Sequence, residues 1–269
     1  MLFAIGSPAA WAAESTYRDL VRKYVADKSQ GVQPANLPGL AAKVEDVMAL
    51  ESTVMLRKNG EEQRVDANEH EFEIGDEIRV RIKPVSQCYI YIFYEGASGA
   101  RKCLLPADDE KAPLAKVNEE LALPSDGSVF EFTPPAGEDK LIVVATEQPS
   151  EDLAALANVV FKKPEDQLSP AEKTLHDSLK GRSDKTLKSI RERQAQGTKY
   201  RGLFDEEAVS KVSAEVQSRG TTRAILEEPP TGKQSSTFAM AASFQKGKSV
   251  ELFVTIPLRS IHGHGSPSN

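Results

Sequence analysis

The sequence predicts an α+β protein built around an antiparallel β-sandwich of immunoglobulin-like type. Residues 77–83 alternate between apolar and charged side chains, which is the period of a half-buried strand. Residues 88–94 are apolar on both faces, and residues 141–145 form a continuous apolar run. Both patterns are typical of strands that are covered on both sides. Turns rich in glycine and proline separate these segments, so short antiparallel connections are the economical arrangement.

Helices are expected before the strands. Apolar side chains recur at helical spacing over residues 14–28 and again over 38–50. A strand over 53–57 should follow, and Lys58-Asn59-Gly60-Glu61 should turn it back. The first long strand then runs from Glu77 to Lys83, because the next residue is a proline, which cannot donate to a ladder.

Two cysteines flank the first central hairpin, whose turn is expected over residues 95–100. A turn centred on Ala97 and Ser98 places Cys103 opposite Ile92. Cys103 would then lie on the same face as Cys88 but about 13 Å away along the strand. A disulfide requires Cα atoms within about 7 Å. We therefore expect two buried free thiols.

The C-terminal half should begin with helices and end with strands. Helices are expected over residues 150–159, 169–180, 183–194 and 205–218, with serine caps at the first three. Residues 236–244 and 249–256 are expected to form a hairpin, which needs a sheet to join because two isolated strands are marginal. Strands around Ile78, Ile92, Phe132, Val143 and Val254 should therefore share one interior. The expected division is a leader (1–13), N-terminal helices (14–50), a β-sandwich (51–149), a helical insertion (150–232), a C-terminal hairpin completing the sandwich (233–258) and a flexible tail (259–269).

Five short motifs follow one another along residues 72–137. They are Phe72-x-x-Gly75-Asp76-x-Ile78-x-Val80, Tyr89-x-Tyr91-x-Phe93-Tyr94, Leu104-Leu105-Pro106, Leu123-Pro124 and Phe132-x-Pro134-Pro135-x-Gly137. In this order they resemble one bacterial family, catalogued as domain of unknown function 4384. The resemblance implies a small β-domain of cell-envelope or signalling proteins, often attached to other modules, with no catalytic residues to transfer. Its structural positions would be Gly75, Asp76, Pro106, Pro134, Pro135 and Gly137.

Charge and terminal sequence bear on partners and location. The net charge of -6 and the scattered cations argue against nucleic-acid binding, which needs clustered positive charge. An apolar start and the small-x-small run Ala10-Trp11-Ala12 favour a secretory signal that lacks its basic region, so we expect a periplasmic or secreted protein. The alternative is an apolar N-terminal helix on a cytoplasmic protein. No segment reaches the roughly 20 apolar residues that span a bilayer.

The sequence offers no catalytic, cofactor or metal signature. Gly232-Lys233 and Gly247-Lys248 lack the earlier glycine of a phosphate loop. His262 and His264 supply two imidazoles, whereas a zinc site requires three or four protein ligands. An enzyme is therefore the less favoured class.

The sharpest functional candidate is the aromatic row Tyr89, Tyr91 and Phe93, on the face opposite the inferred core. Either the helices cover this row, or it is a platform for a glycan ring or an apolar peptide. The leading hypothesis is a non-enzymatic extracytoplasmic interaction module that binds a protein partner or a cell-envelope component. The alternatives are an envelope hydrolase with a site assembled from dispersed acids and a histidine, and an accessory domain of a secretion or signalling assembly.

Overall fold

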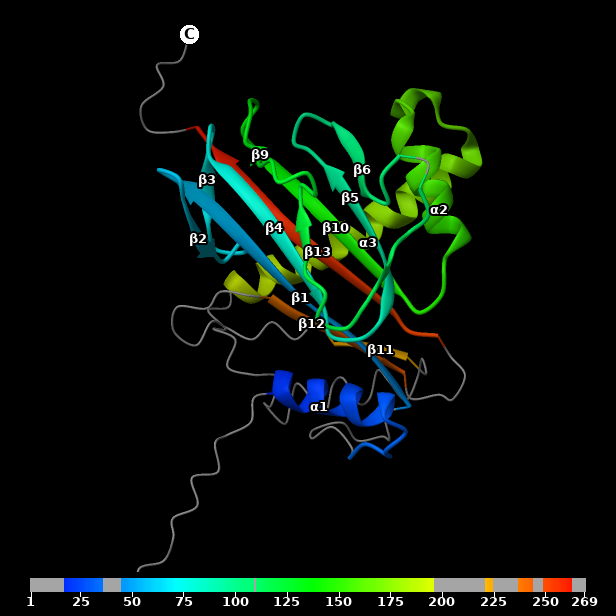
Figure 1. The fold of residues 1–269 in the computed structure, drawn as a ribbon. Coiled ribbons are helices and arrows are strands. Elements are labelled where there is room, and N and C mark those ends of the chain that lie inside the picture. Colours follow the sequence, from blue (N-terminus) through cyan, green and yellow to red (C-terminus); the bar gives the residue numbers. More distant parts are fainter. Residues whose placement is uncertain are drawn as a thin grey trace, which may run out of the picture.

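The computed structural model is a stack of layers: a helix, a β-sheet, a second β-sheet and further helices (Figure 1). The α+β sandwich expected from the strand patterns is confirmed. The structure describes residues 17–35, 45–108, 110–195, 221–224, 237–243 and 249–262.

The first sheet, sheet A, has the strand order β11-β12-β1-β4-β8. Strand β2 also pairs with β1, and β9 with β4. Every pairing in this sheet is antiparallel. Its strands are β1 (Asp46–Lys58), β2 (Glu61–Val65), β4 (Glu77–Pro84), β8 (Leu121–Leu123), β9 (Phe130–Glu131), β11 (Thr221–Ala224) and β12 (Thr237–Ser243).

The second sheet, sheet B, has the order β3-β13-β10-β5-β6, with β7 also paired to β5. Strands β3 and β13 are parallel, and the other pairs are antiparallel. The strands are β3 (Glu71–Glu73), β5 (Cys88–Glu95), β6 (Arg101–Leu105), β7 (Leu114–Ala115), β10 (Glu138–Thr146) and β13 (Glu251–Ile261).

Alternate side chains of both sheets form the main core. On β4, Ile78, Val80 and Ile82 are at most 1% exposed, while the residues between them lie on the outer face. Burying a side chain of this size contributes about 1.5–3 kcal/mol to stability. The strands expected to share an interior do share it, since one cluster contains Ile78, Ile92, Phe132, Val143 and Val254.

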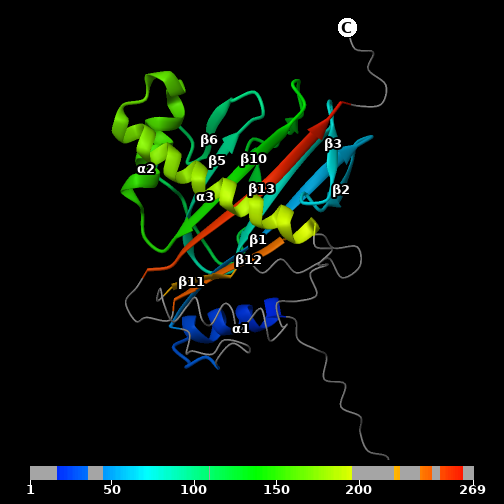
Figure 2. The same ribbon diagram turned by 180° about the vertical axis from the view of Figure 1, so that it is seen from behind.

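Helices cover the outer faces of the two sheets. Helix α1 (Tyr17–Ser29) packs Val21 and Tyr24 against part of sheet A. Helices α2 (Glu151–Asn158) and α3 (Pro170–Ala195) cover sheet B, joined by the short turns η1 (Val160–Lys162) and η2 (Glu165–Gln167) (Figure 2). Ser150 caps α2 as expected, since its side chain accepts a hydrogen bond from Leu153 N at 3.3 Å. The described parts contain no helix that is both long and apolar enough to cross a membrane.

Part of the second expected N-terminal helix is wrong. Residues 46–50 open strand β1 and pair with β12 instead of forming a helix. The reason is that Val47 and Ala49 are buried under α1 while Met48 and Leu50 face the main core. A run that is apolar on both faces satisfies a helical pattern as well as a strand pattern.

The C-terminal strands exist, but they do not form a hairpin with each other. Strand β12 joins sheet A beside β1, whereas β13 joins sheet B between β10 and β3. Strand β13 also includes Arg259–Ile261, which the sequence assigned to a flexible tail. The insertion is not wholly helical, because it contains β11, and a single helix α3 replaces two expected helices. The helix expected over residues 205–218 lies outside the described residues.

The two thiols are free, as expected, but only Cys88 is buried, Cys103 is half-buried, and the hairpin register is different. Cys103 lies opposite Phe93, with an irregularity in the ladder between Ile92 and Phe93. Cys103 therefore packs on the outer face of sheet B, while Cys88 lies in the main core. The two side chains therefore lie on opposite faces of one sheet, whereas the expected register placed them on the same face.

Candidate functional site

The aromatic row on β5 is covered by the chain's own helices. Tyr91 and Phe93 are 1% and 0% exposed, and they pack with residues of α2, η1 and α3. The Tyr91 hydroxyl accepts a hydrogen bond from Ser150 N at 3.1 Å, at the start of α2. Tyr89 is partly exposed and borders the same cluster. The platform interpretation is therefore corrected for Tyr91 and Phe93, which anchor the helices, and only Tyr89 retains exposed surface.

The motif residues shared with the family have local structural roles. Gly75 has a φ of +92°, and its N–H donates to Phe132 O at 2.8 Å. The Asp76 carboxylate accepts a hydrogen bond from Glu73 N at 2.9 Å, so the pair shapes the turn between β3 and β4. Pro106 follows the last residue of edge strand β6, and Pro134-Pro135 lie between β9 and β10. Prolines at such positions end strands without removing a ladder hydrogen bond from a strand interior.

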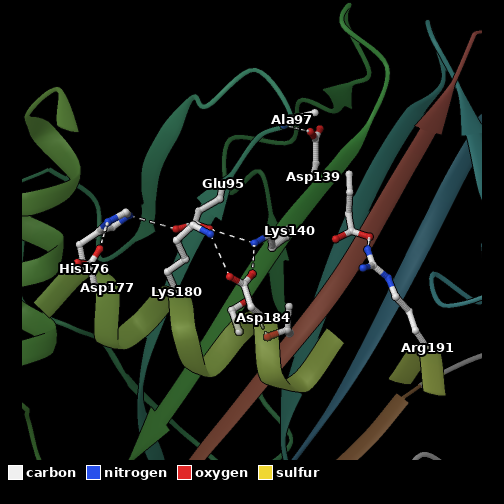
Figure 3. Close-up of polar contacts among 12 residues, drawn as sticks. Glu95, Ala97, Asp139, Lys140, His176, Asp177, Lys180, Asp184 and Arg191 are labelled. Atoms are coloured by element: carbon white, nitrogen blue, oxygen red, sulfur yellow. Dashed lines mark hydrogen bonds and ion pairs between the residues drawn. The ribbon is translucent and has the colours of Figure 1, made fainter. Parts of the chain in front are cut away.

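Titratable side chains gather between α3 and sheet B, as Figure 3 shows. His176 Nε2 lies 3.3 Å from Glu95 Oε1, and Glu95 Oε2 lies 3.5 Å from Lys140 Nζ. Lys140 also contacts Asp184 at 2.8 Å, and Asp184 contacts Lys180 at 3.0 Å. We call this group the α3 ionic cluster, and its members are Glu95, Lys140, His176, Lys180 and Asp184.

The inner end of the α3 ionic cluster is buried. The His176 side chain is 2% exposed and that of Glu95 is 10% exposed. Burial alone would raise the pKa of Glu95, but the contacts with His176 and Lys140 outweigh it and lower the pKa. Burial would likewise raise the pKa of Asp184, but its contacts with Lys140 and Lys180 outweigh burial and lower the pKa. The Glu95 and Asp184 carboxylates are therefore stabilised in their ionised form, and their contacts link α3 to the sheet.

Sequence reasoning missed this cluster, because Glu95 and His176 lie on separate elements. A weak signal exists in α3 itself. His176 and Ser183 lie seven residues apart, two helical turns, and both are buried beside Leu179 and Leu187. Polar residues on the apolar stripe of an otherwise polar helix indicate partners on the surface that the helix covers.

The outer face of sheet A differs from that of sheet B. Helix α1 covers only part of it, and the part formed by the β1–β2 end and β4 carries charged side chains. Glu62 contacts Arg79 at 3.1 Å and Arg81 at 2.8 Å, and Arg57 contacts Glu77 at 3.6 Å. Charged side chains of three strands are aligned on this face by the register of β1 with β2 and β4. We define the charged face of sheet A as Arg57, Glu62, Arg64, Glu77, Arg79, Arg81 and Lys83.

The remaining chemical candidates do not assemble a centre within the described residues. His70 stacks edge-on against Phe72 at 4.7 Å, and His262 follows the end of β13. In the described ranges, no group of three or more histidine, cysteine, aspartate or glutamate side chains could hold a metal ion. Gly232-Lys233, Gly247-Lys248 and His264 lie outside the described residues.

The fold and these contacts define a helix-flanked β-sandwich in which the motif residues shape turns and strand ends. The family described as domain of unknown function (DUF4384) matches residues 71–149, so the resemblance inferred from the motifs is confirmed over that stretch. It covers less than a third of the chain and runs from β3 through β10. No curated protein and no solved structure matches the chain. The matched segment lacks β1 and β13, the central neighbours of β4 and β10, so the sandwich requires residues on both sides of it.

Proposed function

We propose that this chain is a non-enzymatic interaction module that acts outside the cytoplasm and binds a protein partner through the charged face of sheet A. The main support for this proposal is the contrast between the outer faces of sheets A and B. Sheet B is closed by α2 and α3, whereas the side chains on the charged face of sheet A are exposed or half-exposed and have no covering helix among the described elements.

The chemistry of the charged face favours a protein partner of mixed charge. Arg81 contacts two carboxylates, Glu62 at 2.8 Å and Glu120 at 3.5 Å, so cations and anions alternate across the strands. Alternating charge selects a partner with complementary charges and disfavours partners that place like charges together. An anionic glycan would meet the acidic side chains as well as the basic ones, and is the less favoured occupant.

Two sequence features support a location outside the cytoplasm. The first is the secretory-type N-terminal sequence, and the second is the matched family segment, whose resemblance implies envelope or signalling proteins. The hydrolase alternative has weaker support, because Glu95 of β5 and His176 of α3 are buried between that helix and sheet B, and a substrate would have to displace the helix to reach them. An accessory role in a larger assembly differs from this proposal only in the partner.

Site-specific photocrosslinking tests the proposed face. Thr53 lies at its centre, opposite Arg81 in the register of β1 and β4. A photoreactive phenylalanine analogue at Thr53 should crosslink a partner from an envelope fraction, whereas the same group at Lys185, on the exposed side of α3, should not.

Charge reversal supplies the matched control. Arg57→Glu with Lys83→Glu should abolish the Thr53 crosslink, while Lys185→Glu with Lys188→Glu, an equal change of charge on α3, should leave it intact. Urea unfolding of both variants establishes that each is folded. Equal crosslinking from both positions, or a Thr53 crosslink that survives reversal on the charged face, would reject this face as the binding surface.

A further inference from the structure

The interface between α3 and sheet B is unusually rich in charge. Besides the buried residues Leu179, Leu187 and Ile190, α3 contacts the sheet through charged pairs that join it to three strands. Ser183 adds a buried contact with Thr255 of β13 at 3.2 Å. The charged pairs, part of which Figure 3 shows, are His176–Glu95, Asp184–Lys140, Arg182–Glu251 and Arg191–Glu138.

Each of these four pairs contains one carboxylate. Protonation of the carboxylate removes the negative charge and leaves a cation facing a neutral group. The main core between the sheets consists of apolar side chains, so the same protonation removes nothing from it. Acid therefore weakens the attachment of α3 more than it weakens the main core.

His176 strengthens this asymmetry because it is buried. When Glu95 becomes neutral, the buried His176 side chain no longer faces an anion at 3.3 Å, so the contact that holds this buried polar group is weakened. Asp177 Oδ1 lies 3.8 Å from His176 Nδ1 but is on the exposed side of the helix. The other charged groups around this histidine and its neighbours are Lys140 on β10, Lys180 and Asp184 on α3, Glu165 on η2 and Arg101 on β6.

Gly181 divides α3 near its centre. A Cβ at this position would meet nothing within 4 Å, so packing does not require a glycine. Glycine inside a helix costs about 0.5–1 kcal/mol relative to alanine. The helix thus has a weak point between His176 on one side and Arg182, Ser183 and Asp184 on the other.

From the carboxylate in every charged pair and the weak point at Gly181, we infer that α3 is an acid-released strap: it leaves sheet B, bending at Gly181, before the sandwich unfolds. Its release uncovers Phe253 of β13, over whose ring the Arg182 guanidinium of α3 lies at 4.2 Å. The direction follows from linkage. The pKa values of Glu95 and Asp184 are lowered in the folded protein, so their stabilisation is present above the ordinary carboxylate range and is lost as pH falls through the lowered values.

Amide hydrogen exchange of the full chain as a function of pH tests the strap. Exchange is followed by mass spectrometry and normalised to the intrinsic rate at each pH. Peptides of α3 should lose protection at a higher pH than peptides of β4 and β10. Loss of protection in all three at a single pH would overturn the inference, because the helix and the sandwich would then open together.

Variants separate release of the helix from general acid sensitivity. Glu95→Gln with Asp184→Asn should expose α3 already at neutral pH, whereas Glu120→Gln with Glu192→Gln, which removes two exposed carboxylates outside the interface, should retain the wild-type profile. Equal profiles for the two double variants would refute the role of the paired carboxylates.

An engineered disulfide tests the strap even if the Glu95→Gln, Asp184→Asn variant fails to fold. Ser183→Cys with Thr255→Cys joins α3 to β13 where the two hydroxyl oxygens are 3.2 Å apart. The oxidised form should keep the centre of α3 protected in acid, and reduction should restore release.

Gly181→Ala should shift release of α3 to lower pH, because alanine strengthens the helix at this point. An unchanged pH of release would disprove bending at Gly181.

Discussion

At the residue scale, the residues of the five motifs form turns and close backbone contacts. Gly137 shows this most directly. Its N–H donates to Ser260 Oγ at 3.2 Å, and its carbonyl accepts from Ser260 N at 2.7 Å, so its backbone joins the start of β10 to β13. A Cβ added at Gly137 would lie 2.6 Å from the Cβ of Ala97. The close approach of the 95–100 turn is what requires a glycine here.

We predict that Gly137→Ala destabilises the protein by about 1–3 kcal/mol, because the added methyl group overpacks a contact that backbone hydrogen bonds hold in place. Urea unfolding measures the change. Gly181→Ala is the matched control, since its new methyl group meets open space, and it should stabilise by about 0.5–1 kcal/mol.

The double variant Gly137→Ala with Ala97→Gly isolates the cause. Removing the Ala97 Cβ leaves the Ala97 Cα, 3.9 Å away, as the nearest atom that the new methyl group would meet. Most of the lost stability should therefore return. If the double variant is as unstable as the sum of the single changes, the steric explanation fails.

A second prediction at this scale concerns the thiols. Burial raises the pKa of both Cys88 and Cys103 to about 12, so little thiolate exists at pH 8 in the folded protein. Native protein should react slowly with a thiol reagent, and denatured, unreduced protein should titrate two thiols per chain. Absence of free thiols in the denatured sample would show that the two cysteines are bonded and that the register of β5 with β6 is different.

At the element scale, the sequence predicts best where one face is polar. Strand β4 alternates cleanly, and the predicted range Glu77–Lys83 lies within one residue of its observed bounds. Residues 46–50 are apolar on both faces, and only the position of α1 and the main core on opposite sides decides that they are a strand. The α3 ionic cluster could not be predicted, because the contact between Glu95 and His176 depends on how α3 crosses the sheet and not on local spacing.

The junction of β5 with α2 gives a prediction at the same scale. The Tyr91 hydroxyl bonds both Ser150 N at 3.1 Å and Ser150 O at 3.4 Å, so it fixes the start of α2 on the sheet. Tyr91→Phe should cost about 0.5–1.5 kcal/mol through the lost hydrogen bonds. Tyr91→Ala should cost about 3–5 kcal/mol because it also leaves a cavity.

Tyr89→Phe, in the same row but partly exposed, serves as the control and should change the free energy of unfolding less than Tyr91→Phe. All three variants are compared by urea unfolding. An unchanged stability of Tyr91→Ala would mean that α2 does not cover the row, and the platform hypothesis would return.

At the scale of the whole molecule, the sheets are assembled from distant parts of the chain. Strand β1 near the N-terminus pairs with β12 near the C-terminus, and β13 lies between β10 and β3. The sequence predicted that the last strands need a sheet, because an isolated pair is marginal. It could not predict that they enter different sheets, since their patterns fit a hairpin equally well and strand neighbours are chosen by long-range packing.

This topology predicts that a chain ending at Gly232 does not fold. Its loss of β12 exposes the edge of β1, and its loss of β13 separates β3 from β10 and removes Leu252, Val254 and Ile256 from the main core. Unpaired, apolar strand edges favour aggregation. We therefore expect insoluble protein, measured as the soluble fraction and by thermal unfolding.

A chain ending at His262, which keeps every described strand, is the matched control and should fold. Poor solubility alone has many causes, so complementation carries the decision. If β12 and β13 fill the vacant positions in the two sheets, the 233–269 segment produced in the same cell should recover soluble 1–232 in a stoichiometric complex. A soluble 1–232 chain with a cooperative unfolding transition would show instead that the two sheets close without their last strands.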